Sequence, residues 1–474
     1  MMAACGVTAV LAVLTLAMTW PLGAHLASSV PGGYGEPLQA IWAMSWVMRS
    51  LTTALAHPAT LTGFWNAGIF VPEPHALAFS EPLIGESLLV LPLHWLGATP
   101  LACYNTAFLA SWVLSGLGMF LLVRSLARHD RADSSPSRPA TIAGITAALV
   151  IAFNPFRVAG AVNRLDEQSI QWLPFALLAV HRYLETDRRR ALLLAALAAI
   201  ALNLSSIDRL LYGSGLIVVF ALVQIVRLQR WQARVWFELW AAGAGVLVVT
   251  LICALPYLEM QRLFGAAPRP VGLEVLAAAV LAIGVGLAAG KIASRWPRHG
   301  SIAIAVALCA YLGAMRAAPF PLDQPHVSGT LAAPPPTLAL NRPSPPIYRE
   351  LRALSSDALV VELPLGDPAY DLRYLFFAAT HARRLMNGYG RVIPPSYRAL
   401  QQVLLNPVLD LEQTRKAIAP ATHVLVHRGA WPEAVGTEVA KQLAAMGGTV
   451  VARDGDDVLF QMQPPERVTA WQTP

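Results

Sequence analysis

The stretch PGGYGEPLQAIWAMSWVMRSL, residues 31–51, lies between apolar runs of membrane-spanning length at 3–22 and 101–123. It places the acid Glu36 in a glycine-rich turn, directly before a segment of helical period that carries tryptophans. Indole rings on a weakly charged helix favour the boundary between lipid headgroups and acyl chains. We therefore expect a juxtamembrane helix that holds the Glu36 carboxylate just outside the bilayer, where it acts on a lipid-borne substrate. The simpler alternative is that Glu36 caps this helix.

Composition indicates the class of protein. Hydrophobic residues make up 55% of the 474 positions and charged residues only 13%, with a mean hydropathy of +0.51. A soluble chain carries about a quarter charged residues. Repeated apolar runs near bilayer length predict a polytopic α-helical membrane protein. Arginine in cytoplasmic loops accounts for the net charge of +7, so we expect membrane lipids, and no nucleic acid, as partners.

We predict about nine transmembrane helices, because arginine clusters then follow every even-numbered helix, as the positive-inside rule requires. This count places the N-terminus in the cytoplasm and everything after residue 316 outside. The segment 82–97 is short, holds Glu86 and is broken by Pro92, so it is predicted to be a second juxtamembrane helix on the outer side. The predicted spans are residues 3–22, 101–123, 139–156, 168–185, 190–206, 211–227, 236–257, 271–291 and 300–316.

Changes in composition divide the chain into parts. Residues 1–316 are predicted to form the transmembrane domain, with a large first outer loop at 23–100. A proline-rich linker follows at 317–346. Residues 347–474 are predicted to form an extracytoplasmic α/β domain, because apolar runs of strand length alternate there with segments of helical period.

Within this last part, connections through helices predict a partly parallel sheet that ends in a hairpin turning on Asp454, Gly455 and Asp456. The loop at 387–400, rich in glycine, tyrosine and proline, is either the cover of an active site or an ordinary loop. Its histidines, His381, His423 and His427, are scattered and predicted to be structural. Strands are expected at 358–364 and 422–429, and helices at 369–385, 395–405, 410–419 and 433–447.

Metal-binding and disulfide patterns are not evident in the sequence. The cysteines fall inside apolar runs without paired spacing, so they predict neither a disulfide framework nor a metal site. They are Cys5, Cys103, Cys253 and Cys309.

Charged and amide residues near the outer ends of the predicted spans form a candidate site. Such charges cost about 2.5–3.5 kcal/mol each at membrane depth, so they usually face a cavity or a partner. Guanidinium groups can hold a departing phosphate, and a carboxylate can take a proton from an acceptor hydroxyl. Alternatively, Arg164–Asp166 and Asp208–Arg209 are ion pairs that anchor helix ends. The candidate substrate-binding residues are Glu73, Glu81, Arg157, Asn163, Arg164, Asp166, Asp208 and Arg209.

The architecture resembles the GT-C class of integral-membrane glycosyltransferases: a first span, an outer loop with an acid before an aromatic-rich helix, many spans and an outer α/β domain. The segments GEPLQAIWAMSW (35–46), NAGIFVPEPHALAFSEPLIGE (66–86) and LMNGYGRVIPPSYRAL (385–400) are similar to a largely uncharacterised group of bacterial polytopic proteins assigned to this class. The resemblance covers nearly the whole chain.

The resemblance implies a polyprenyl-phosphate-linked sugar donor, a catalytic carboxylate in the first outer loop, and inversion at the anomeric carbon. Glu36 stands at the position of that carboxylate, although the group more often shows aspartate there. Histidine is common where Arg164 stands, and aromatic residues where Asp208 and Arg209 stand. Because of these departures, the resemblance determines neither the identity of the substrate nor whether catalysis is retained.

We therefore expect a glycosyltransferase at the outer face of the bacterial inner membrane, with a glycan, lipid or protein acceptor. Glu36 would be the general base, and Arg157 and Arg164 would grip the phosphate. Glu73 and Asp166 would assist the base or hold a divalent cation, the one cofactor considered. The alternatives are a non-catalytic membrane protein that binds a polyprenyl lipid or scaffolds envelope-glycan assembly, and a transporter.

Overall fold

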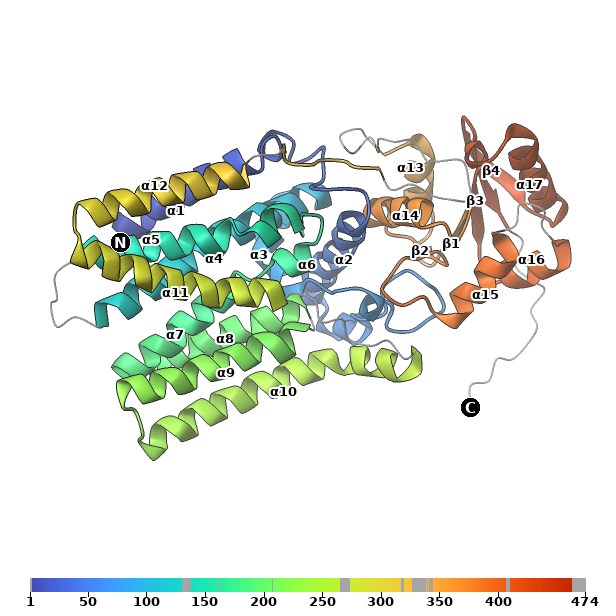
Figure 1. Cartoon of the computed structure of the whole chain (residues 1–474). Helices are drawn as coiled ribbons and strands as arrows, with labels where there is room; N and C mark the ends of the chain where they lie inside the picture. The colour runs from blue at the N-terminus through green and yellow to red at the C-terminus, as the bar shows by residue number, and fades with distance from the viewer. Residues whose placement is uncertain are drawn as a thin grey trace. The chain divides into compact units, whose positions relative to one another are not determined.

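The computed structural model is mostly helical, with a small sheet near the C-terminus (Figure 1). Its residues form two compact units, which we describe separately. The helical unit comprises Met1–Gly32, Glu81–Glu259 and Ala267–Leu322, and the mixed unit comprises Gly33–Ser80, Met260–Ala266 and Asp323–Pro474. Most of the predicted linker 317–346 lies outside the described residues. The described residues are 2–129, 138–160, 162–206, 208–264, 273–316, 319–325, 338, 340, 344–405 and 410–462.

Within the described residues, every predicted span contains a helix. Four of these helices are long and apolar enough to cross a membrane, judged by length and composition over the described residues. They are Pro100–Arg128, Arg138–Gly160, Ala233–Phe264 and Leu276–Arg295. A polytopic helical membrane protein is thus supported, and the number of crossings stays a prediction. The helices are α1 (Met2–Met18), α4 (Pro100–His129), α5 (Arg138–Ala152), α7 (Trp172–Thr186), α8 (Arg189–Ser205), α9 (Asp208–Leu228), α10 (Ala233–Phe264), α11 (Leu273–Arg295) and α12 (His299–Met315).

Small residues let the helices of the helical unit approach one another closely. A Cβ atom on Gly286 of α11 would lie 2.7 Å from the carbonyl oxygen of Ala143 on α5. Contacts of this kind suit association in lipid, where apolar burial alone does not drive helices together. The side chains of Phe237 and Trp240 on α10 are 67% and 70% exposed, as expected for a surface that faces lipid instead of water.

The mixed unit contains a five-stranded sheet in the order β2-β1-β3-β5-β4. Its β1 pairs in parallel with β2 and β3, whereas β5 is antiparallel to β3 and β4. The predictions of a partly parallel sheet and of a C-terminal hairpin are therefore confirmed. The strands are β1 (Leu359–Leu363), β2 (Arg384–Leu385), β3 (His423–His427), β4 (Thr449–Asp454) and β5 (Asp457–Gln461).

Helices α14 to α17 of the mixed unit begin within two residues of the positions predicted from periodicity, whereas α13 was not predicted. Asp367 and Asp410 cap α14 and α16 by accepting hydrogen bonds from backbone amides of the first turn, which explains where these helices start. The helices are α2 (Glu36–Ala56), α13 (Pro346–Ala353), α14 (Pro368–His381), α15 (Pro395–Leu404), α16 (Leu411–Ile418) and α17 (Glu433–Ala445), with short helical turns η2 (Pro58–Gly63), η3 (Ala76–Phe79) and η5 (Arg428–Ala430).

Part of the predicted first outer loop packs on the sheet domain. Helix α2 lies against α14, where Ser45 Oγ and Arg49 Nη1 both donate to the carbonyl oxygen of Ala379, at 3.2 and 2.9 Å. The amide of Leu385 donates to Gly68 O at 2.8 Å, and Val71 N donates to Leu385 O at 3.1 Å. The edge of the sheet at β2 is thereby covered, which removes a surface open to unwanted strand pairing.

The burial of the tryptophans on α2 contradicts the predicted environment of this helix. The tryptophans were expected at the lipid headgroups, yet Trp42 is only 2% exposed. The indole nitrogen of Trp46 donates to Phe64 O at 2.8 Å. The periodicity correctly predicted a helix, but the face that carries the indoles contacts protein because α2 packs on α14.

The loop at 387–400 is held in place by close packing. Asn387 Oδ1 accepts from the amide of Glu362 at 2.7 Å, and Asn387 Nδ2 donates to Glu362 O at 2.8 Å. A Cβ atom on Gly388 would lie 2.6 Å from the ring of Phe70, and the same ring makes an edge contact with Tyr397. The loop therefore requires glycine where it meets the first outer loop.

Gly388→Ala is expected to lower the free energy of unfolding by about 1–3 kcal/mol, because the added methyl group would overlap the Phe70 ring. The measurement is the thermal unfolding midpoint of the full chain in detergent. Gly63→Ala is the matched control, since a Cβ atom there meets nothing within 4 Å. Equal midpoints for the two variants would contradict this account of the packing.

Candidate functional site

Glu36 is the first residue of α2 and is half-buried. The N-cap residue is Gly35, so Glu36 is not itself the N-cap. Pro37 follows it, in the first turn where proline is favoured. A carboxylate at this point lies in the positive field of the helix N-terminus, which stabilises its ionised, proton-accepting form.

The other acids predicted in the first outer loop belong to different units. Glu73 is half-buried in the mixed unit, in the irregular segment before η3. Glu81 is half-buried in the helical unit, shortly before α3 (Ile84–Trp95).

In the helical unit, predicted site residues gather around the short helix α6 (Leu165–Gln168). Arg209 Nη2 donates to the carbonyl oxygens of Asp166 and Glu167, both at 3.0 Å. Arg157 is 0% exposed, and its Nη2 donates to Gln168 O and to Ser115 Oγ. These guanidinium groups therefore satisfy the carbonyls at the C-terminal end of α6, where positive charge is favoured.

Several N–H groups of these arginines remain available. Among the described residues, Nε and Nη1 of Arg157 and Nε of Arg209 are buried without a hydrogen-bond partner. A buried N–H group without a partner costs about 1–3 kcal/mol, so such groups usually meet water or a ligand.

Arg164 has a different partner from the one the sequence suggested. Its guanidinium pairs with the buried carboxylate of Glu167, three residues along, and not with Asp166. Asn163 and Asp166 are half-buried beside it, in the turn before α6 and in α6 itself. Asp208 begins α9, but its side chain lies outside the described residues.

Sequence reasoning left out of the candidate site the acid that is most deeply buried among the described residues of this unit. Glu86 on α3 is 0% exposed, and Gln171 Nε2 donates to its carboxylate at 3.4 Å. Helix α3 packs against α4 and α8 and continues through Pro92. The sequence did contain a signal for this site, namely an acid inside an apolar segment. A buried acid is tolerated only where polar groups surround it, so such an acid indicates a polar site.

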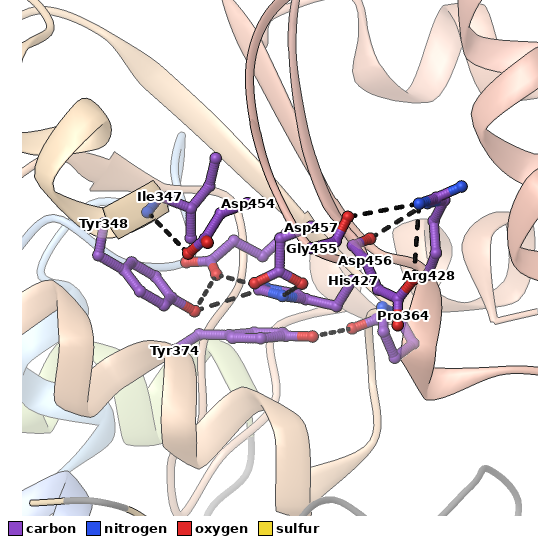
Figure 2. Close-up of polar contacts among 11 residues, drawn as sticks. Ile347, Tyr348, Pro364, Tyr374, His427, Arg428, Asp454, Gly455, Asp456 and Asp457 are labelled. Atoms are coloured by element: carbon purple, nitrogen blue, oxygen red, sulfur yellow. Dashed lines mark hydrogen bonds and ion pairs between the residues drawn. The ribbon is translucent and has the colours of Figure 1, made fainter. Parts of the chain in front are cut away.

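The mixed unit contains a polar cluster around His427, shown in Figure 2. His427 Nδ1 lies 2.8 Å from Asp457 Oδ1, and Nε2 lies 3.1 Å from Glu362 Oε2. Tyr348 Oη donates to the same Glu362 oxygen at 2.8 Å, and the ring of Tyr374 stacks on His427 at 5.2 Å. The cluster joins β1, β3, β5 and α13, so the structural role predicted for His427 is consistent with this geometry.

The protonation state of His427 makes the stability of this cluster depend on pH. Burial by itself lowers the pKa of His427, but its hydrogen bonds to Asp457 and Glu362 outweigh burial and raise the pKa from 6.5 to about 9. A group with a raised pKa contributes stability that is complete below its unfolded pKa and is lost as pH rises through its folded pKa.

Raising the pH from about 6.5 to above 9 is therefore expected to remove about 3 kcal/mol of stability from the mixed unit. The measurement is the thermal unfolding midpoint of the full chain across this pH range. His427→Gln should flatten the profile, whereas the exposed His57→Gln should leave it unchanged. A wild-type midpoint that does not fall between these pH values would contradict the charged state assigned to His427.

No group of three or more His, Cys, Asp or Glu side chains suited to a metal ion occurs among the described residues. The divalent cation considered from the sequence thus gains no support from the side chains that the structure describes.

These observations define a polytopic helical membrane protein with a small mixed α/β sheet near its C-terminus. No family model and no curated protein matches the sequence. A solved structure does match in fold: the single-particle cryo-EM structure of the arabinofuranosyltransferase AftD from mycobacteria. The match covers 97% of this chain with a TM-score of 0.56 and 14% identity. The chain spans 41% of the length of that protein, and the likeness concerns the fold alone.

Proposed function

We propose that this chain is a membrane glycosyltransferase that moves a sugar from a polyprenyl-phosphate-linked donor to an acceptor at the outer face of the bacterial inner membrane. The observation that carries the proposal is the similarity of fold, over 97% of the chain, to a mycobacterial arabinofuranosyltransferase. The proposed topology has about nine spans, a cytoplasmic N-terminus and an extracytoplasmic α/β domain.

Glu36 is the proposed general base. It would take the proton of the acceptor hydroxyl while the sugar–phosphate bond breaks and the phosphate leaves on the lipid. Its place supports this role: Glu36 is half-buried in the first turn of α2, directly after the glycine-rich turn, where the resemblance puts the catalytic carboxylate.

The proposed phosphate ligands are arginines of the helical unit. Arg157 and Arg209 are supported by their buried N–H groups without partners, which a phosphate oxygen could satisfy. Arg164 would have to exchange its ion pair with Glu167 for the phosphate. Asn163, Asp166, Asp208, Glu73 and Glu81 stay proposed substrate contacts.

A reconstitution experiment tests the proposal. The full chain in nanodiscs is incubated with radiolabelled pentose and hexose donors linked to polyprenyl phosphate, together with an envelope extract as acceptor. The transferase proposal requires acceptor-dependent release of polyprenyl phosphate. Retention of donor on the protein without any release would support the alternative, a non-catalytic protein that binds polyprenyl lipid.

A further inference from the structure

The mixed unit contains a cavity of about 380 Å³, of whose lining residues only Glu73 has a part in the proposed reaction. Its walls come from the middle of α2, from the segment 66–74 and from the region where α14 leads into β2. All three segments belong to the mixed unit. Cavities that bind small molecules measure about 300–1,000 Å³, so this one could hold a ligand the size of a sugar.

The lining of this cavity carries more positive than negative charge. Arg49, Arg383 and Arg384 line it, and none of them makes an ion pair with another described residue. Arg383 Nη2 donates to Arg352 O at 2.9 Å, while its Nε is buried without a partner in the part of the chain that is described. Guanidinium groups placed in this way favour a carboxylate or phosphate, which can accept from more than one N–H group.

The histidine next to these arginines adds no further positive charge at neutral pH. His381 is buried, and burial together with the charges of Arg49 and Arg383 lowers its pKa to about 3. It is therefore uncharged at neutral pH. Glu73 is the only acid among the residues that line the cavity, so their formal charge is positive.

The remaining lining groups suit a sugar ring. Trp46 contributes an indole surface on which the C–H face of a pyranose can pack, whereas Trp42 is buried and only borders the cavity. The Trp46 nitrogen is committed to Phe64 O, whereas Trp42 Nε1 donates to no other described residue. Asn66 uses its Oδ1 for the amide of His75 and keeps its NH₂ group for a ligand, and the Glu73 carboxylate can accept from hydroxyl groups.

We propose that this cavity binds an acidic saccharide, that is, a pyranose that carries a carboxylate as in a uronic acid. The ring would pack on the indole of Trp46, Asn66 and Glu73 would bind hydroxyl groups, and the guanidinium groups would bind the carboxylate. Binding does not require catalysis. The occupant could also be part of the acceptor glycan of the proposed transferase. That assignment, unlike binding itself, rests on the proposed function.

Calorimetric titration of the full chain in detergent, without any donor, tests the proposal. The probes are methyl β-D-glucuronide, the neutral methyl β-D-glucoside with the same ring, and acetate as an anion without a ring. The glucuronide is expected to bind at least about tenfold more tightly than either of the others, because only it can contact both the guanidinium groups and the Trp46 indole.

Two substitutions on the cavity wall should change the affinity in opposite directions. Neither Arg384 nor Glu73 makes a side-chain hydrogen bond within the described residues, so both variants should fold. Arg384→Gln should weaken glucuronide binding about tenfold, and Glu73→Gln should strengthen it by removing a like charge. Arg398→Gln, an exposed arginine on α15 outside the cavity, should have no effect.

Equal affinities for glucuronide and glucoside, or an Arg384→Gln variant that binds like wild type, would overturn the proposal. Strong binding of acetate alone would indicate a general anion site and overturn it as well. Since donor turnover is not measured in this titration, a chain that binds glucuronide without transferring sugar would disprove the proposed function and leave the cavity assignment standing.

Discussion

Replacing Glu36 with glutamine is expected to lower the rate of sugar transfer by about 100- to 10,000-fold, the usual contribution of a general base. Glutamine keeps the size and the hydrogen-bonding shape of glutamate but cannot take a proton. The chain should still fold, because Glu36 is in the first turn of α2, where loss of the favourable dipole interaction costs only about 0.3–1 kcal/mol. The measurement is donor turnover in nanodiscs, together with the thermal unfolding midpoint.

The chain offers a matched control for this substitution. Glu433 is likewise the first residue of its helix, α17, and it is exposed. Glu433→Gln removes the same charge from the same helix position without touching the proposed base. If both variants transfer sugar at the wild-type rate, Glu36 only stabilises its helix and the assignment of the base is wrong. Glu36→Asp should retain partial activity, since it keeps the charge on a shorter side chain.

Replacing Glu362 with alanine is expected to destabilise the mixed unit by about 3–5 kcal/mol, the typical cost of removing one member of a buried ion pair. Glu362 is 0% exposed on the central part of the sheet, and its Oε2 meets both His427 and Tyr348. Its loss would leave the positive charge of His427 compensated by Asp457 alone. The measurement is the thermal unfolding midpoint at pH 7.

A double-mutant cycle separates the pair from the packing of its side chains. If the ion pair carries the effect, His427→Ala combined with Glu362→Ala should cost clearly less than the sum of the single variants. Additive costs would show that lost packing explains the destabilisation. Glu412→Ala is the control for an exposed pair: its partner is Lys416 at 2.6 Å on the surface of α16, and the midpoint should not change.

Local patterns in the sequence predicted most of the elements. Apolar runs gave the positions of the helices, and alternation of strand-length runs with helical segments gave a partly parallel sheet, because these signals depend on neighbouring residues. The same reasoning was wrong about what covers the tryptophan-bearing face of α2. Hydrophobic period shows which side chains share a face of a helix, but it does not show whether lipid or protein covers that face, and only the structure placed Trp42 against protein.

The candidate sites were less predictable, because their members are distant in sequence. Arg209 meets carbonyl groups more than forty residues away, and the cavity beside α2 combines its indoles with arginines more than three hundred residues later. Neither pairing leaves a spacing that can be recognised in the chain. The cluster of Glu362, His427 and Asp457 arises in the same way from strand register.

The sequence by itself thus determined the class of protein, most of the helices and four of the five strands, since each follows from apolar content and local periodicity; β2 lies within a predicted helix, and α13 was not predicted. The tertiary structure alone decided which charges are paired. It paired Arg164 with Glu167 and Glu362 with His427, and it left the arginines of the cavity without an ion pair to any described residue. The physical reason is that charge pairing depends on distance and burial, which the fold sets and residue order does not reveal.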